Sequence, residues 1–395
     1  MTPLLRNTLF AAILATSSVM AAPRFDSQPV FPPEHFHNHS PGVVETAAGD
    51  LISCWFHGRG EKGDDTLVIR GARKRRGAKE WSSPFLMADN QDLPDQNCVL
   101  FIDPQQTLWL FWVSSLDNTI RTFLLKYRTA RKYDRDGPPQ WDWQDVIHVR
   151  PKNFEAVHRQ ATARVERDFA KRLAGGRDRF DLGVAARGDK FWQRVGWMTR
   201  THPIMLSRKR MMLPLYSDHF LCSLAAFTED GGKTWEFSEP FGSMSIQPSF
   251  VRKKNGDIVA MMRDRHVRQR IPISTSKDQG QTWSEVESME IPNPGSSVEC
   301  IILGSGHWLL VCNDTDGGPR KGRYQLSVYL SDDEGKSWKW KRLLEQHGED
   351  TAASYPSVIQ SQDGTIHCLY TFSPSPGETI KHVWFDEAWV REGVR

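Results

Sequence analysis

Three aspartates, Asp230, Asp278 and Asp333, recur in one eight-residue pattern, S/T-x-D-x-G-x-S/T-W. The copies are about 50 residues apart, a period typical of repeat folds and propellers. Regularly spaced carboxylates could serve acid–base catalysis. The pattern favours a structural role, because an Asp followed two residues later by Gly suits a tight turn whose N–H groups bond the carboxylate. We predict that these boxes are turns, each with a Trp that packs on a neighbouring repeat.

Two histidines offer a second kind of chemistry. His37 and His39 alternate along an extended stretch, so both side chains should point to one face. Because histidine titrates near neutral pH, one of them could act as a general acid or base. A metal site lacks a third ligand nearby in the sequence, so no metal or cofactor is expected. A packing or turn role for each histidine remains open beside the catalytic one.

Strands are the elements that must position these groups. Short runs rich in β-branched and aromatic residues, each preceded by a turn signal, recur between the boxes. They group into six units, which predicts an all-β, six-bladed propeller of four-stranded antiparallel blades over residues 23–395. Radial closure of such blades removes most exposed sheet edges. We expect a strand near Phe31 to complete the last blade.

One segment departs from the strand pattern. Apolar residues fall at helical spacing, namely Phe154, Val157, Ala161, Val165, Phe169 and Leu173. We therefore predict a helical insertion over about residues 143–200, between the second and third blades. It could form a lid or rim over the site, and it could equally decorate the surface.

The chain's ends and bulk composition set its expected surroundings. Residues 1–22 combine Arg6, a short apolar run and a small-residue cleavage site, which predicts a signal peptide and export to a periplasm or beyond. No segment is long enough to span a bilayer. A net charge of +3 gives no reason to expect a nucleic-acid partner. The six Cys are scattered in apolar runs, so we interpret them as core residues, with one disulfide pair as the open alternative.

The boxes and the six-unit layout resemble the Asp-box (BNR) repeats of the sialidase superfamily. In that family the boxes lie on the side of the propeller away from the active site. The resemblance implies an acidic sugar as substrate, whose carboxylate several arginines would bind with fork-shaped donors. It also implies a Tyr nucleophile, a known exception among glycosidases.

Three positions match parts of that family's site. Tyr355, in Ser354-Tyr355-Pro356, resembles the nucleophile of the last blade. Arg323 lies eight residues before Ser331, where the family has a triad arginine, and Arg263 resembles another. We expect Tyr355, Arg263 and Arg323 to meet at the propeller axis.

Other positions depart from the family pattern. His37 and His39 stand where the first triad arginine is expected, and Gln247 stands where a Glu should assist the tyrosine. A Gln cannot accept the phenol proton, so Glu299 in the next blade is a candidate substitute. The first-blade loop should supply the acid that protonates the leaving oxygen and an arginine that could replace the missing one. Its candidates are Glu61, Asp64 and Asp65 for the acid and Arg59 for the arginine.

Three functions fit these residues. The first is a retaining exo-glycosidase of sialidase type, which releases a terminal acidic sugar. The second is a polysaccharide lyase on a uronate, in which an arginine neutralises the carboxylate and His39 or Tyr355 takes the C5 proton. The third is a glycan-binding propeller without catalysis.

Overall fold

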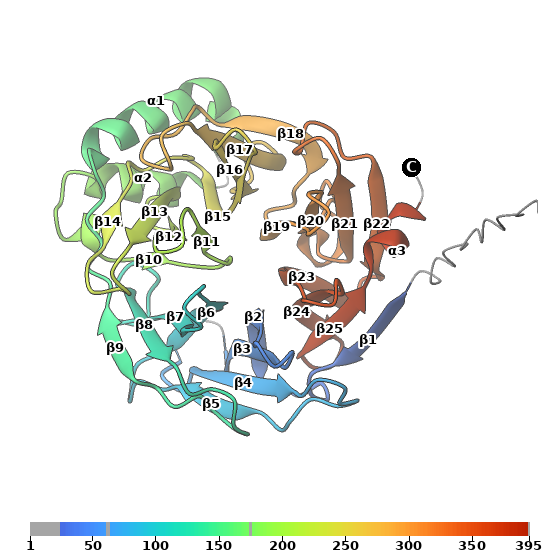
Figure 1. Cartoon of the computed structure of the whole chain (residues 1–395). Coiled ribbons are helices and arrows are strands. Elements are labelled where there is room, and N and C mark those ends of the chain that lie inside the picture. Colours follow the sequence, from blue (N-terminus) through green and yellow to red (C-terminus); the bar gives the residue numbers. More distant parts are fainter. Residues whose placement is uncertain (1–23, 61–63, 174–175, 394–395) are drawn as a thin grey trace, which may run out of the picture.

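The computed structural model describes residues 24–60, 64–173 and 176–393. Six antiparallel sheets surround one axis (Figure 1). Each sheet has four consecutive hydrogen-bonded strands, and the third has a short fifth strand paired to its second. The predicted all-β, six-bladed propeller is therefore confirmed. The predicted signal peptide lies outside the described residues.

The blades follow one another along the chain. The first has β2 (His37–Glu45), β3 (Leu51–Gly58), β4 (Val68–Lys74) and β5 (Phe85–Ala88). The second has β6 (Asp95–Ile102), β7 (Leu108–Ser114), β8 (Leu124–Ala130) and β9 (Trp143–Val146). The third has β10 (Trp197–Met198), β11 (Ile204–Met205), β12 (Met211–Ser217), β13 (Cys222–Thr228) and β14 (Glu236–Phe237).

The remaining blades complete the ring. The fourth has β15 (Ser245–Arg252), β16 (Ile258–Asp264), β17 (Arg270–Ser276) and β18 (Glu287–Pro292). The fifth has β19 (Val298–Ile302), β20 (Trp308–Cys312), β21 (Gln325–Ser331) and β22 (Trp340–Gln346). The sixth has β23 (Thr351–Gln360), β24 (Ile366–Pro374) and β25 (Thr379–Phe385), followed by α3 (Glu387–Arg391).

An N-terminal strand closes the ring, as predicted. β1 (Phe25–Pro29) pairs antiparallel with β25, from Phe25 opposite Phe385 to Pro29 opposite Lys381. The sixth sheet therefore contains both ends of the propeller, and its edge is covered by the start of the chain.

The boxes form the turns between third and fourth strands of blades three to five. The Asp278 carboxylate accepts hydrogen bonds from the Thr282 amide at 3.0 Å, the Thr282 hydroxyl at 2.6 Å and the Ser276 hydroxyl at 2.8 Å. Asp230 and Asp333 make the same contacts within their own turns. These bonds satisfy the carboxylates locally, which confirms the structural role predicted for them.

The box tryptophans and glycines join neighbouring blades. The Trp235 ring lies edge-on to Phe111, a residue of the second blade, with ring centroids 6.3 Å apart. Gly232 has φ +89°, and a Cβ there would come within 3.0 Å of the Trp109 ring. A side chain at this position would therefore separate the second and third blades.

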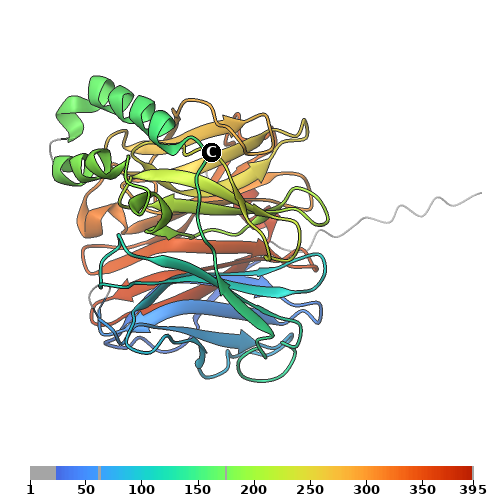
Figure 2. The same ribbon diagram turned by 90° about the vertical axis from the view of Figure 1, so that its left-hand side faces the viewer.

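Two helices fill the segment between β9 and β10, as predicted between the second and third blades, but the predicted bounds of 143–200 were too wide, because β9 and β10 at either end belong to the blades. They are α1 (Phe154–Leu173) and α2 (Arg177–Ala186), and a short 3₁₀ turn (Trp192–Arg194) follows. Val165, Leu173 and Phe180 pack on residues of the β12–β13 and β16–β17 connections. Figure 2 shows both helices at one face of the ring. The second strand of each blade ends at this face, which is opposite to the face that contains the boxes.

All six cysteines are buried in the blades, and none forms a disulfide. Their interpretation as core residues is confirmed. For example, Cys54 and Cys98 belong to one apolar cluster with residues of the first and second blades. A small apolar side chain suits the close approach of inner strands at this point.

Candidate active site

Four innermost strands contain a bulge at the same level of the ring. In each of these strands the pairing register with the neighbouring strand shifts by one residue or more. The shifts lie between His39 and Gly42, Gln96 and Val99, Ile246 and Ser249, and Ser354 and Ser357. One residue in each bulge is left-handed: Ser40 (φ 58°), Asn97 (φ 48°), Gln247 (φ 54°) and Tyr355 (φ 61°). Such backbone is unfavourable for residues other than glycine, and bulges of this kind redirect side chains beside active sites.

The redirected side chains meet across blades. The Gln247 and Asn97 amides both donate to the Tyr216 hydroxyl, at 3.1 and 3.2 Å. The Tyr355 hydroxyl accepts a hydrogen bond from Arg263 Nη1 at 2.7 Å. These residues come from the second, third, fourth and sixth blades, so the cluster lies at the axis of the ring.

Three guanidinium groups surround the Tyr355 ring. Besides the Arg263 hydrogen bond, Cζ of Arg323 lies 5.1 Å and Cζ of Arg200 5.3 Å from the ring centroid. Burial opposes the charge of Arg263, yet its pKa is raised, because the negative forms of Tyr355 and Asp218 favour the cation. By the same interaction, these cations favour the phenolate of Tyr355 over the phenol. Tyr355, Arg263 and Arg323 are thus brought together as expected; their chemical roles stay predictions.

Arg200 was not among the candidates. It follows β10, and its guanidinium is fully buried. Nη1 donates to the Pro41 carbonyl at 3.2 Å and Nη2 to the Pro356 carbonyl at 2.9 Å. These prolines follow the left-handed Ser40 and Tyr355, so Arg200 links two bulges across the axis. Every other blade begins with an inner strand, so the third blade also needs one, and the segment before Met211 must provide it. This requirement was a signal that could have revealed Arg200.

The two histidines share one face, as their spacing predicts. Their ring centroids are 5.3 Å apart, and the His39 ring lies 4.2 Å from that of Tyr355. Burial, followed by the nearby His37 and arginine charges, holds the pKa of His39 well below its usual value. His39 is therefore neutral at pH 7 and could accept a proton. His37 instead contacts a Glu378 carboxylate oxygen at 2.8 Å.

Glu299 is buried and is held by partners that belong to two other blades. One carboxylate oxygen is 2.8 Å from His202 Nδ1, and the other accepts the Val358 amide at 2.8 Å. Burial opposes its charge, yet the pKa of Glu299 is lowered, because His202 and Arg200 favour the carboxylate. Its position suits a counter-charge for these two cations.

The first-blade loop is placed only in part. Glu61 lies outside the described residues, and Asp65 is exposed. Asp64 accepts hydrogen bonds from the Thr66 amide and hydroxyl, which lower the pKa of Asp64. Arg59, which is 69% exposed, lies 3.5 Å from Asp64. An ionised, turn-capping Asp64 is poorly suited to donate a proton, so Glu61 and Asp65 remain the predicted acids.

Comparison with known families identifies the repeat family of the chain. Residues 49–161 and 183–368 match the BNR repeat-like domain family. The chain belongs to this family. The match omits residues 162–182, which lie within the helical segment of this BNR-repeat propeller. No curated protein matches the chain.

Solved structures share the fold at low identity. A protein of unknown function from Dyadobacter fermentans is 16% identical, with a TM-score of 0.67 over 93% of this chain and 100% of its own. A Hadza microbial sialidase is 16% identical, with a TM-score of 0.64 over 89% of this chain and 66% of its own. The NanB sialidase from Streptococcus pneumoniae is 13% identical, with a TM-score of 0.65 over 92% and 71%. The BNR-repeat chain thus shares its propeller fold with these sialidases at low sequence identity.

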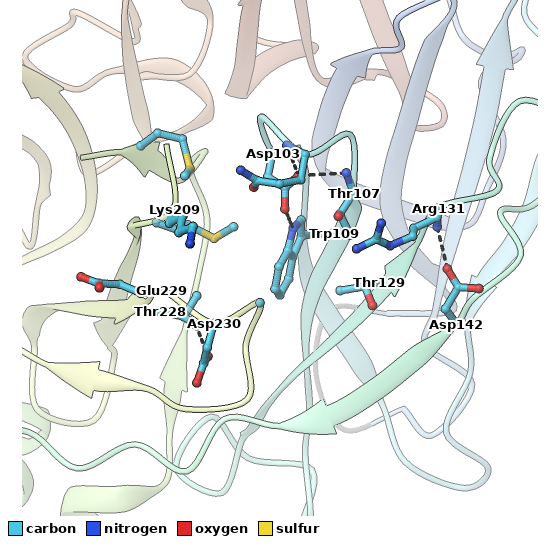
Figure 3. A pocket seen from close by; sticks show the side chains of 14 residues that line it. Asp103, Thr107, Trp109, Thr129, Arg131, Asp142, Lys209, Thr228, Glu229 and Asp230 are labelled. Carbon is cyan, nitrogen blue, oxygen red and sulfur yellow. Dashed lines mark hydrogen bonds between the residues drawn. The ribbon is translucent and has the colours of Figure 1, made fainter. Parts of the chain in front are cut away.

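A cavity of about 360 Å³ lies on the box side of this BNR-repeat propeller, between the second and third blades. Figure 3 shows the side chains that line it. Its carboxylates serve local structure. Asp103 accepts from the Thr107 amide and Trp109 Nε1, both at 2.9 Å. Asp230 is engaged by its own box. We interpret this cavity as a gap between blades.

Among the described residues, no helix has the length and apolar character of a bilayer span.

Proposed function

We propose that this propeller is an exo-acting glycoside hydrolase of sialidase type that releases a terminal acidic sugar. The observation that supports it best is the 2.7 Å hydrogen bond from Arg263 to the Tyr355 hydroxyl, with Arg323 and Arg200 around the same ring. Guanidinium forks bind carboxylates, and cations beside a phenol favour its ionised, nucleophilic form. The sialidase structures of the same fold are consistent with this class.

The reaction would proceed in two displacements. Tyr355 Oη, as the phenolate that the surrounding cations favour, attacks the anomeric carbon as the glycosidic C–O bond breaks, while a carboxylic acid of the first-blade loop protonates the leaving oxygen. The resulting carboxylate then takes a proton from a water molecule, whose oxygen attacks the anomeric carbon and displaces Tyr355 as the phenolate. Arg263 and Arg323 would hold the sugar carboxylate, and Arg200, which is fully buried, would keep the Tyr355 bulge in place.

Two variants test this assignment on a sialoside substrate. Tyr355→Phe removes the nucleophile and should lower kcat by about 10³-fold or more. Gln247→Glu restores the carboxylate that the family uses near the tyrosine, and should raise kcat by about tenfold. Unchanged melting temperatures would show that both variants are folded. Full activity in Tyr355→Phe would refute the nucleophile.

A lyase is the second candidate, and the neutral His39 ring 4.2 Å from Tyr355 favours it. In that reaction His39 or Tyr355 would remove the C5 proton of a uronate, whose carboxylate an arginine neutralises. The C4–O bond would then break, leaving an unsaturated sugar. Incubation with uronate-containing glycans distinguishes the two reactions, since only the lyase product has the new ultraviolet absorbance. Binding of acidic glycans without either product would indicate a non-catalytic propeller.

A further inference from the structure

A second basic hollow adjoins the Tyr355 cluster. It has a volume of about 630 Å³ and lies between the two helices and the connections that follow β12 and β16. Its lining includes Arg172, Arg177, Arg179, Arg265 and His266. Arg265 is two residues beyond Arg263, and the charge of Arg263 contributes to lowering the pKa of Arg265. The hollow is therefore electrostatically continuous with the axial arginines.

Two of these arginines already have strong partners. Arg172 Nη1 donates to the Val267 carbonyl at 2.8 Å. Arg177 donates to Glu166 at 2.8 Å and to Asp181 at 2.9 Å. Arg177 is thus held by two carboxylates and Arg172 by one carbonyl, and these contacts fix the helices on the rim of the hollow.

Arg179 and Arg265 differ from this pair. Each approaches Asp218 Oδ1 at 3.8 Å, beyond hydrogen-bonding distance, and neither guanidinium donates a hydrogen bond to a described residue. Oδ1 of Asp218 is buried without a hydrogen-bond partner among the described residues. Because Asp218 forms a hydrogen bond with neither guanidinium, both arginines retain N–H donors that another anion could engage.

The surrounding charges favour such an anion. Burial lowers the pKa of Arg265, and the like charges of Arg263 and Arg179 lower it further, whereas Asp218 raises it. Asp218 thus faces several guanidiniums, and Asp178 is the one carboxylate among the described residues that line the hollow. A second negative group would relieve this repulsion and could accept the unused N–H donors of both arginines.

We propose that Arg179 and Arg265 form a subsite for a second anionic group, a carboxylate or sulfate, on the glycan unit next to the terminal acidic sugar. This proposal rests on the proposed function for the identity of the first sugar. The helical insertion contributes Arg179, so it would select for glycans that carry two neighbouring negative charges.

Calorimetric titration of the full chain tests the subsite. Two pairs of probes are compared. N-acetylneuraminic acid and its α2,8-linked dimer test a second carboxylate, and sialyllactose and sulfated sialyllactose test a sulfate. Wild type should bind at least one of the two doubly charged probes about tenfold more tightly than its singly charged counterpart. The Arg179→Gln/Arg265→Gln variant should lose this preference while its affinity for the singly charged probe stays unchanged.

Matched variants exclude a merely structural effect. Arg177→Gln removes a charge from the same helix and should keep the preference, because its donors face Glu166 and Asp181. Asp218→Asn removes the competing carboxylate and should tighten binding of the preferred doubly charged probe severalfold, which a residue that only holds loops together would not do. An equal preference for the doubly charged probes in wild type and in the double variant would overturn the subsite. If wild type prefers neither doubly charged probe, the sulfate response described below decides, and its absence would also overturn the subsite.

Inorganic sulfate separates this proposal from the proposed function. At constant ionic strength, sulfate should raise the melting temperature of wild type and of Arg263→Gln, and should raise that of the double variant less. Loss of sugar binding together with a sulfate response that depends on Arg179 and Arg265 would overturn the proposed function and leave the subsite standing. A sulfate response equal in wild type and the double variant would overturn the subsite.

Discussion

The aspartates on the two faces of the propeller differ in how their oxygens are satisfied, although buried nitrogens without a partner among the described residues occur on both faces, such as Trp235 Nε1 and Trp338 Nε1 on the box face. On the box face each aspartate is satisfied within its own turn, as Asp278 is by Ser276 and Thr282. On the face where the second strands end, several buried polar atoms of the described residues have no hydrogen-bond partner, including Arg200 Nε, Arg263 Nε, Asp218 Oδ1 and Gln247 Oε1. Incomplete satisfaction of this kind is typical of surfaces that bind ligands, whereas complete satisfaction is typical of structural turns.

Among the substitutions that compare the two faces, Arg200→Met should have the largest effect on unfolding free energy and activity. This change leaves the Pro41 and Pro356 carbonyls without their donor and Glu299 without one of its cations. Breaking one side of a buried charge arrangement costs about 3–5 kcal/mol, so we expect a loss of that size in unfolding free energy by urea titration. We also expect activity to fall, because Tyr355 loses the support of its bulge. Arg200→Lys should lose less of both. Wild-type stability in Arg200→Met would show that the axis needs no buried cation.

A smaller effect should appear in the pH dependence of stability. Burial opposes a charged His202, but Glu299 raises the pKa of His202 above its ordinary value of 6.5. A raised pKa in the folded state contributes stability that is complete below pH 6.5 and is lost as pH rises through the folded value. One such proton changes the unfolding free energy by at most about 1.4 kcal/mol per pH unit.

Glu299→Gln sharpens this test. Without the carboxylate, the pKa of His202 is no longer raised, so the loss of stability above pH 6.5 should disappear. Urea midpoints measured from pH 6 to pH 9 in wild type and variant check it. A wild-type curve as flat as that of the variant would contradict the pairing of Glu299 with His202.

The smallest effect is expected on the box face. Asp278→Ala removes the hydrogen bonds of one solvent-facing turn, which should cost about 1 kcal/mol of unfolding free energy. Because this turn is on the opposite face from Tyr355, kcat should not change. Thermal unfolding together with an activity assay measures both quantities. A loss of kcat without a loss of stability would contradict the separation of the two faces.

The parts of the molecule that depend on local pattern could be predicted from the sequence. A box such as Ser276–Trp283 contains its own donors and acceptor, so its turn follows from eight neighbouring residues. Tyr355, Arg263 and Arg323 were found through motifs in separate blades. Arg200 was missed because its partners, Pro41 and Pro356, reach it only after the ring closes.

The same reason explains the other surprises. Asp218 and Arg179 are distant in sequence and come together only because α2 packs on the β12–β13 connection. Gln247 was recognised as a departure from the family, but its partner Tyr216 was not, since no local pattern joins them. The repeated residue–Pro pairs at Ser40, Gln247 and Tyr355 were a usable signal for the bulges, because they recur at one level of the inner strands.

The pairing of β1 with β25 has a consequence for how the molecule is made. Tyr355 belongs to a sheet whose outermost strand, β1, precedes the other five blades in the chain and whose other three strands follow them. Contacts of such long sequence separation form late, because the intervening chain must first be ordered. Tyr355 therefore reaches its arginines only after the strands of all six blades have been synthesised, and a chain that terminates before β23 would carry the cations without their phenol.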